Sequence, residues 1–354
     1  MLRSFTLKNF RCFRELTLNS FNRINLIAGE NNVGKTALLE AIHLHCDSSD
    51  SALPTMINQW RGIENPTKAF GEWWTWLFFD KNTTNRAELR SQDEQGKEHS
   101  VSLRLTDIAT AQSGLPPDVG KPPGGFPGIG WHANSPCLVL KQEGSKDALR
   151  IVWVIGPNGE AWYTPAEAWR VPCEFLASRL SSAKRDVAHF SALKIEKRLS
   201  ELLPSIQILE PRLVDLDLAT IGDTSVVHGD IGLSRLVPVP LMGEGVGRLL
   251  SILLAIFLTP GGIILIDEIE NGLHYSVQKK VWQAIGHACR EAEVQVFATT
   301  HSWECIQAAH HAFKESGPYE MRYYRLDRIK DSIDVKSMDG EMLSRIERTD
   351  LEIR

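Results

Sequence analysis

The sequence predicts an α/β fold built around a parallel core sheet. Three segments carry this prediction, since each is a short apolar strand that ends in glycine or polar residues: 24–29, 263–268 and 294–302. Uninterrupted aliphatic runs are typical of parallel strands that are buried on both faces. Open α/β sheets bind their ligands at the carboxyl ends of such strands. We therefore expect the functional residues at these three strand ends.

Bulk properties limit the function classes. The 354 residues suffice for two domains, or for one large domain with an insertion. The formal net charge of −5 gives no overall attraction to nucleic acid, so a DNA partner would need a local basic patch. Six scattered cysteines form no CxxC pair, which argues against a zinc framework or a disulfide scaffold. The N-terminus lacks the apolar core of a signal peptide, and the longest apolar run, 249–258, is too short to span a bilayer. We expect a cytoplasmic protein with no membrane partner.

The first segment contains a phosphate-binding loop. Its motif, G-x-x-x-x-G-K-T, lies between a strand and a helix, which is the context that a P-loop requires. The glycines let backbone N–H groups approach the phosphates, the lysine reaches the β- and γ-phosphates, and the threonine hydroxyl ligates Mg²⁺. A chance match in a glycine-rich turn is the disfavoured alternative. The residues predicted to bind the nucleotide here are Gly29, Asn31, Asn32, Gly34, Lys35 and Thr36.

Two carboxylates follow the second strand. Asp267 and Glu268 come directly after the aliphatic run 263–266. Asp267 can hold Mg²⁺ through a water molecule, and Glu268 can polarise the water that attacks the nucleotide. Without the P-loop, two solvated charges that close a strand would be the simpler explanation. With it, the pair is predicted to be catalytic.

A histidine follows the third strand. His301 can donate to the terminal phosphate and hold the attacking water in line. The alternative is a residue that only forms the first turn of the next helix.

A Gly-Glu-Gly sequence precedes the longest apolar helix. Gly243, Glu244 and Gly245 stand before the run 249–258. The first N–H groups of a helix lack intrahelical partners, so such a cup can bind an anion. Alternatively, the glycines only permit a tight turn.

Taken together, the order of these motifs resembles that of an ABC-type ATPase head. More narrowly, the chain resembles the RecF/SMC-like branch and, within it, the OLD-type (overcoming lysogenisation defect) ATPases of bacteria. The motifs that carry the resemblance are FTLKNFRCF (5–13), IDEIENGLH (266–274) and FATTHSWECI (297–306). The resemblance implies a P-loop ATPase head with a parallel core sheet, an antiparallel flank from the N-terminal strands and an inserted subdomain, and it implies ATP and Mg²⁺ as cofactors.

The resemblance also implies roles for single residues. Arg11 of the Asn-Phe-Arg group is expected to bind nucleotide, and Gln59 to monitor the metal as a Q-loop residue. The segment 241–248 stands where ABC proteins carry the signature loop, which caps the γ-phosphate held by the other protomer. Here Gly243 occupies the usual serine position and Glu244 replaces a glycine. We expect slow turnover, with donors from Gly245 onward and Arg248 compensating.

Three regions follow from the motif positions. We expect an N-terminal part of the ATPase domain at 1–50, an inserted tryptophan-rich subdomain with its own small core at 51–175, and the rest of the ATPase domain at 176–354. The insertion holds eight of the ten tryptophans, which fill a core or form a partner surface. Its stretch 113–130 is predicted to be irregular. A basic amphipathic helix at 181–203 is a candidate for phosphate-backbone contact, or else is simply solvated.

These expectations combine into one function and its alternatives. The leading hypothesis is a Mg-ATP-dependent homodimer or larger homo-oligomer that switches a separate effector, such as a TOPRIM-type nuclease, in bacterial anti-phage defence. About fifty residues follow His301, too few for a TOPRIM domain of its own. The alternative is a RecF-like DNA-clamping ATPase in repair or replication. A transporter ATPase subunit is disfavoured by the long interval between P-loop and signature.

Overall fold

The computed structural model describes residues 1–50, 52–61, 70–113, 134, 136–143, 149–155, 161–163, 169–178 and 183–348. Within these ranges, no helix combines the length and the apolar character needed to cross a bilayer. The predicted irregular stretch lies outside the described residues from 114 onward.

The core of the molecule is a six-stranded sheet, as the sequence predicts. Its strand order is β16-β15-β3-β14-β13-β9, with five neighbouring strands parallel and β16 antiparallel at one edge. The strands are β3 (Ile24–Gly29), β9 (Cys173–Leu176), β13 (Ile263–Ile266), β14 (Gln295–Thr299), β15 (Met321–Ile329) and β16 (Ser332–Met338). Every residue of β3, β13 and β14 is buried, which explains their unbroken apolar sequences.

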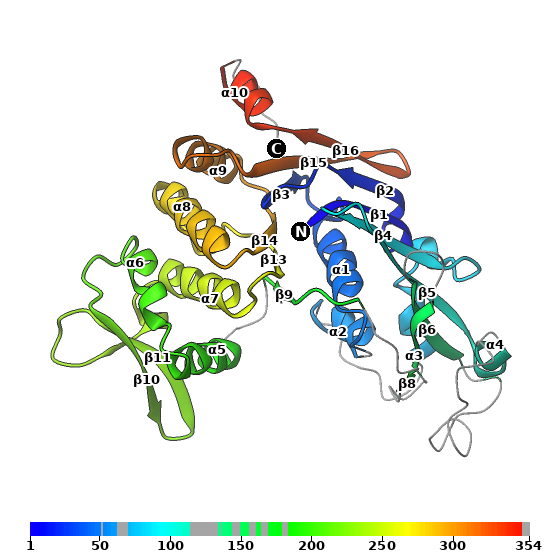
Figure 1. Ribbon diagram of the computed structural model, residues 1–354, viewed down its shortest axis with the longest axis horizontal. Helices are drawn as coiled ribbons and strands as arrows, with labels where there is room; N and C mark the ends of the chain where they lie inside the picture. The colour runs from blue at the N-terminus through cyan, green and yellow to red at the C-terminus, as the bar shows by residue number, and fades with distance from the viewer. Residues whose placement is uncertain are drawn as a thin grey trace.

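The two faces of this sheet carry two separate hydrophobic cores. Alternate residues of β13 point to opposite cores, with Ile264 and Ile266 in one and Ile263 and Leu265 in the other. Helices α7 (Glu244–Leu258), α8 (Tyr275–Glu291) and α9 (Trp303–Glu315) contribute to the first core. Helix α1 (Lys35–Cys46) contributes to the second. Figure 1 shows α1 on one side of the core strands, with α7, α8 and α9 on the other.

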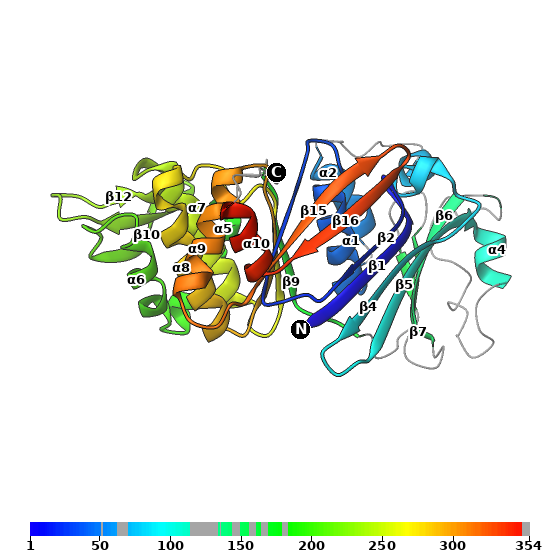
Figure 2. The ribbon, with the colours of Figure 1, turned by 90° about the horizontal axis from the view of Figure 1, so that it is seen from above.

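A seven-stranded antiparallel sheet covers the other side of α1 (Figures 1 and 2). Its order is β2-β1-β4-β5-β6-β7-β8. The strands are β1 (Leu2–Phe10), β2 (Phe13–Asn19), β4 (Ala87–Asp93), β5 (Glu98–Asp107), β6 (Pro136–Glu143), β7 (Leu149–Ile155) and β8 (Ala161–Tyr163). The predicted antiparallel flank is therefore present. The short helices α2 (Leu53–Gln59), α3 (Phe70–Thr75) and α4 (Ile108–Ser113) belong to the same half of the molecule.

The expectation that the insertion has its own core is wrong for the described residues. Strand β4 pairs directly with β1, with Leu89 opposite Leu7, so the insertion extends the N-terminal hairpin. Trp74 is fully buried in the same core as Phe5 and α1. Strand β9 lies in the core sheet although it spans the predicted boundary at 175/176. The boundaries at 50/51 and 175/176 themselves stay a prediction.

The tryptophans of the insertion divide between core and surface. Trp74 fills the core, whereas Trp76 is exposed and Trp60 and Trp169 are half-buried. Trp131 lies outside the described residues.

A small lobe lies next to α7. It contains the three-stranded sheet β10 (Asp215–Ile221), β11 (Thr224–Asp230) and β12 (Val237–Pro238), and helices α5 (Ala183–Ile195) and α6 (Leu203–Ile206). The helix predicted for 181–203 ends early, at Ile195, because Lys197 adopts a left-handed backbone with φ 60°. Ile195 is 82% exposed, so it does not belong to the apolar face, whereas Phe190 and Leu193 are buried.

Candidate nucleotide-binding and hydrolysis site

The phosphate loop connects β3 to α1, and two glycines determine its shape. Gly29 has φ 146°, and a Cβ there would lie 2.4 Å from the carbonyl oxygen of Leu326. Gly34 has φ 105°, precedes the first residue of α1, and would place a Cβ 2.6 Å from Cys12 Sγ. Asn32 also has a left-handed backbone, with φ 64°, which asparagine tolerates better than most residues. The loop conformation is thus set by packing within the chain.

Lys35 bends back over this loop. Its ammonium donates to the carbonyl oxygens of Gly29 at 2.7 Å and of Glu30 at 3.0 Å. Burial lowers the pKa of Lys35, while the nearby carboxylates of Asp267, Glu270 and Glu268 act in the opposite direction. Charged phosphate oxygens are stronger partners for an ammonium than neutral carbonyls are. Lys35 therefore lies where it can turn to a bound phosphate.

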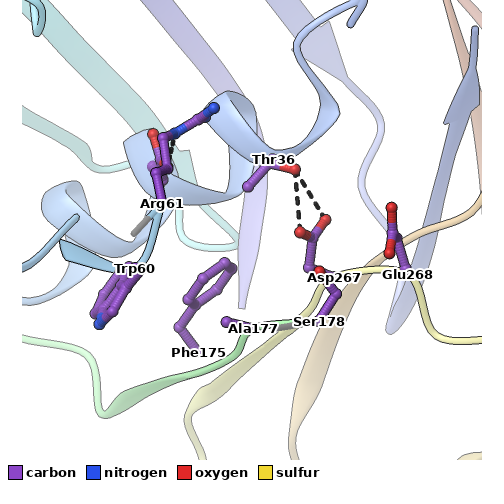
Figure 3. A pocket seen from close by; sticks show the side chains of 9 residues that line it. Thr36, Trp60, Arg61, Phe175, Ala177, Ser178, Asp267 and Glu268 are labelled. Atoms are coloured by element: carbon purple, nitrogen blue, oxygen red, sulfur yellow. Dashed lines mark hydrogen bonds and ion pairs between the residues drawn. The ribbon is translucent and has the colours of Figure 1, made fainter. Parts of the chain in front are cut away.

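Thr36 and Asp267 meet at the carboxyl end of the core sheet. The Thr36 hydroxyl donates to both carboxylate oxygens of Asp267, at 3.1 and 3.0 Å (Figure 3). Asp267 is only 6% exposed, and the Thr299 hydroxyl also donates to its Oδ1 at 2.7 Å. Hydroxyl and carboxylate oxygens are the ligand types that Mg²⁺ prefers, so these two residues fit the predicted ion. When bound, Mg²⁺ would neutralise phosphate charge and orient the reacting group.

Glu268 is held beside Asp267 by a strained backbone. Its φ of 48° is rare for a residue with a side chain and is typical of functional sites. Its N–H donates to Thr299 Oγ1 at 2.8 Å, and its Oε2 accepts from Asn271 Nδ2 at 2.8 Å. The turn directs both carboxylates into one pocket (Figure 3). Glu268 therefore lines the pocket beside Asp267, and its role as the general base stays a prediction.

The pocket beside these residues has a volume of about 250 Å³. Its lining comes from α1, the end of α2, β9 and the end of β13: Thr36, Glu40, Trp60, Arg61, Phe175, Ala177, Ser178, Asp267 and Glu268. Sequence reasoning identified only Thr36, Asp267 and Glu268 of this set. Glu40 had a signal that could have found it, because it follows Thr36 by four residues and thus shares its helix face. Arg61 and Phe175 had no such signal.

Gln59 and Arg11 are among the predicted residues that do not line this pocket. Gln59 is exposed at the end of α2, and the next two residues line the pocket instead. The expectation that Gln59 monitors the metal is therefore not supported by its position. Arg11 is nearly buried, but its guanidinium pairs with Glu40 at 3.1 Å and donates to the carbonyl of Trp76 at 3.2 Å. Burial lowers the pKa of Arg11, although Glu40 opposes this effect.

His301 lies at the rim of the site. Its ring Nδ1 is 3.0 Å from Glu270 Oε1, and its backbone N–H donates to the same oxygen at 2.9 Å. The side chain is 49% exposed. The helix-capping role belongs to Ser302, whose hydroxyl accepts from the N–H of Cys305. A contact between His301 and phosphate stays a prediction.

The signature segment forms the first turn of α7. Gly243 has φ 123° and open space where a Cβ would be, and Gly247 is equally unobstructed. Glu244 is the first helical residue, and its side chain packs against Gly272. Its carboxylate is therefore directed towards its own chain. Arg248 donates to the backbone oxygen of Asp267 at 2.9 Å. Arg248 thus has a hydrogen-bond partner within its own chain, and its compensating role at the cup stays a prediction.

The sheet order, the loop and the paired carboxylates place the chain in the class of P-loop ATPases with an ABC-type head. Residues 24–304 match the AAA_21 family, described as "AAA domain, putative AbiEii toxin, Type IV TA system". Since this match covers well over half of the sequence, the chain belongs to that family.

Individual relatives are distant. The chain is 23% identical over 335 residues to a protein of Helicobacter pylori named "ATP/GTP phosphatase", covering 89% of each. It is 42% identical over 50 residues to "Uncharacterized protein MJECL10" of Methanocaldococcus jannaschii, which is 14% of this chain and 23% of that protein.

Solved structures show the same fold. A head of an Smc protein bound to the C-winged helix domain of ScpA aligns with a TM-score of 0.52 and 13% identity, covering 98% of this chain and 99% of that one. An Smc head with an extended coiled coil, bound to the C-terminal domain of ScpA from Pyrococcus furiosus, aligns with a TM-score of 0.52, 12% identity and 98% coverage of both. The chain therefore has an SMC-like head fold.

Proposed function

We propose that this ATPase binds Mg-ATP, hydrolyses it slowly, dimerises in the ATP state and thereby switches a separate effector protein. The observation that carries the proposal is the difference between the two halves of the site. The P-loop half is assembled within one chain, whereas the first turn of α7 has open space at the cup residue Gly243 and at Gly247, four residues further on. A partner protomer would bring a phosphate to that cup.

Slow turnover is proposed from the composition of the cup. A signature serine is missing, since Gly243 stands in its place, and Glu244 adds a negative charge at the first helical position. A carboxylate at this position stabilises the helix, but its charge repels an approaching anion. The Glu244 side chain packs against Gly272, and this contact holds its carboxylate partly away from the approaching anion.

A role in bacterial defence is proposed from resemblance. The motifs are similar to those of OLD-type ATPases, and the family description names a toxin of a toxin–antitoxin system. Both point to an ATPase that controls a harmful activity. A TOPRIM-type nuclease is the effector that the OLD resemblance favours.

The RecF-like alternative has less support. The cationic residues of α5 and the segment after it are largely engaged in ion pairs: Arg185 with Glu174, Lys194 with Asp217, and Arg198 with Glu196 and Glu201. Cations that are already paired release fewer counterions when a phosphate backbone approaches. Salt-dependent DNA affinity of the purified protein would favour this alternative.

Dependence of hydrolysis on assembly tests the proposal. Specific activity should rise with protein concentration until the oligomer saturates. A bulky residue in or beside the cup should block closure, and Gly247→Trp, one helical turn after Gly243, is the cleanest choice because nothing lies within 4 Å of its Cβ position. Gly245→Trp is less suitable, since a Cβ there already lies 3.1 Å from the carbonyl of Gly272. Gly247→Ala is the matched control and should stay active.

Mixing two inactive variants sharpens this test. Lys35→Ala lacks the P-loop half of the site and Gly247→Trp lacks the cup, so a mixed dimer has one intact half from each chain. Part of the activity should return when the two are combined. Flat specific activity on dilution, together with no recovery on mixing, would mean that each chain works alone.

A further inference from the structure

A buried carboxylate beside the pocket binds two arginines. Glu40 is fully buried on α1, one helical turn after Thr36. Its Oε1 accepts from Arg61 Nε at 2.7 Å, and its Oε2 lies 3.1 Å from Arg11 Nε. Two guanidinium groups therefore share one negative charge, and the cluster carries a net positive charge next to the place predicted for Mg-ATP.

The two arginines differ in their access to the pocket. Arg11 is 9% exposed, and its guanidinium also contacts the Trp76 carbonyl. Arg61 is 39% exposed and lines the pocket together with Thr36, Asp267 and Glu268. In Figure 3 it extends along α1, with Thr36 and the two carboxylates further along the same pocket. Burial lowers the pKa of Arg61, but the carboxylate of Glu40 and, more weakly, that of Asp267 raise it. The pKa of Arg61 is therefore raised overall.

This arrangement allows Arg61 to change partner without leaving a buried charge alone. Removing one member of a buried ion pair is strongly unfavourable, because the other charge loses its compensation. Glu40 would keep Arg11 if Arg61 turned away. A P-loop lysine reaches the β- and γ-phosphates, and the threonine after it ligates the Mg²⁺ that these phosphates hold, so a third phosphate adds negative charge at the Thr36 end of the pocket. A phosphate oxygen accepts hydrogen bonds from a guanidinium group just as a carboxylate oxygen does.

We propose that Arg61 contacts the terminal phosphate of a bound nucleoside triphosphate, and that Glu40 positions Arg61 when this phosphate is absent. The inference rests on nucleotide binding at the P-loop, but not on dimerisation or on an effector. Arg61 follows α2 by two residues, so its change of partner moves the end of α2. The segment 52–61 thereby distinguishes the triphosphate from the diphosphate.

Binding of Mg-ADP and of Mg-AMP-PNP, a non-hydrolysable ATP analogue, to the full chain tests this inference by calorimetry. Arg61→Ala should weaken AMP-PNP binding by about tenfold or more while leaving ADP binding within about twofold, because a charged hydrogen bond to the third phosphate is lost. Arg61→Lys should lose less, since it keeps the charge but not the planar fork. Arg61→Ala leaves Glu40 paired with Arg11, so the fold should stand. Arg212→Ala is the matched control, because Arg212 forms a similar pair with Glu210 on the surface.

Hydrogen exchange of the segment 52–61 provides the second measurement. AMP-PNP should change its exchange rate in the wild type relative to ADP, and this difference should disappear in Arg61→Ala. Equal losses of affinity for both nucleotides would show that Arg61 is only structural, and unchanged affinities would show that it makes no phosphate contact. Either result overturns the inference. Failure of the P-loop assignment is distinguishable, since Lys35→Ala would then retain both nucleotides.

Discussion

The glycines of the phosphate loop and two glycines at the start of α7, Gly243 and Gly247, have opposite surroundings. A Cβ at Gly29 or Gly34 would collide with backbone or side-chain atoms of the same chain, whereas Gly243 and Gly247 have no atom within reach. Packing therefore requires glycine in the loop and shapes it before nucleotide arrives. At Gly243 only the backbone, with φ 123°, requires glycine, and at Gly247 neither backbone nor packing does. The difference teaches that the phosphate loop is shaped within a single chain, while the start of α7 is open around Gly243 and Gly247, as the proposed contact with a partner protomer requires.

The largest effect is expected at Gly29. Gly29→Ala should destabilise the protein by about 2–4 kcal/mol and abolish ATP binding, because the new Cβ meets a backbone oxygen that cannot move aside. Chemical denaturation and calorimetric titration with Mg-ATP measure both. An alanine that is tolerated there would mean that the loop is not held by β15.

Lys35→Ala separates binding from folding. ATP affinity should fall by at least about a hundredfold with the unfolding midpoint nearly unchanged, because the hydrogen bonds of the Lys35 ammonium go to loop carbonyls and not to core side chains. Fluorescent-nucleotide titration and thermal melting suffice to check it. Wild-type affinity in this variant would remove the P-loop assignment.

Glu268→Gln separates hydrolysis from binding. Mg-ATP should still bind, but hydrolysis should drop by about a hundredfold or more, because an amide does not accept the proton of water as a carboxylate does. Phosphate release gives the rate, and light scattering should show that the ATP-bound assembly accumulates. Normal hydrolysis would place the catalytic base elsewhere.

The smallest effect is expected at Gly247. Gly247→Ala should stabilise the protein by about 0.5–1 kcal/mol, since alanine is the better helix former and the site is open. ATP affinity should not change. Chemical denaturation of Gly247→Ala and Gly29→Ala under the same conditions compares the two sites directly. A loss of stability in Gly247→Ala would show that the start of α7 is packed in solution.

Local patterns in the sequence were enough for the main elements of the site. The strand, glycine loop and helix at 24–46, and the carboxylates after 263–266, lie where the pattern predicts. This works because burial on both faces leaves an uninterrupted aliphatic run, and because a phosphate loop needs glycines at fixed spacing. The same local information fails for α5, where a left-handed residue at Lys197 ends the helix although the helical spacing continues.

Contacts between distant segments were decided only by the tertiary structure. The sequence alone predicted that Thr36 and Asp267 carry the chemistry of Mg-ATP, but the parallel order β3-β14-β13 brings them together across 231 positions. The pairing of β4 with β1 turned the expected separate insertion into an extension of one sheet. Arg11 and Arg61 meet on Glu40 because β1 and α2 both pack against α1, an arrangement that no motif spacing encodes. Periodicity reports which face of an element is buried, whereas the partner of that face depends on long-range packing.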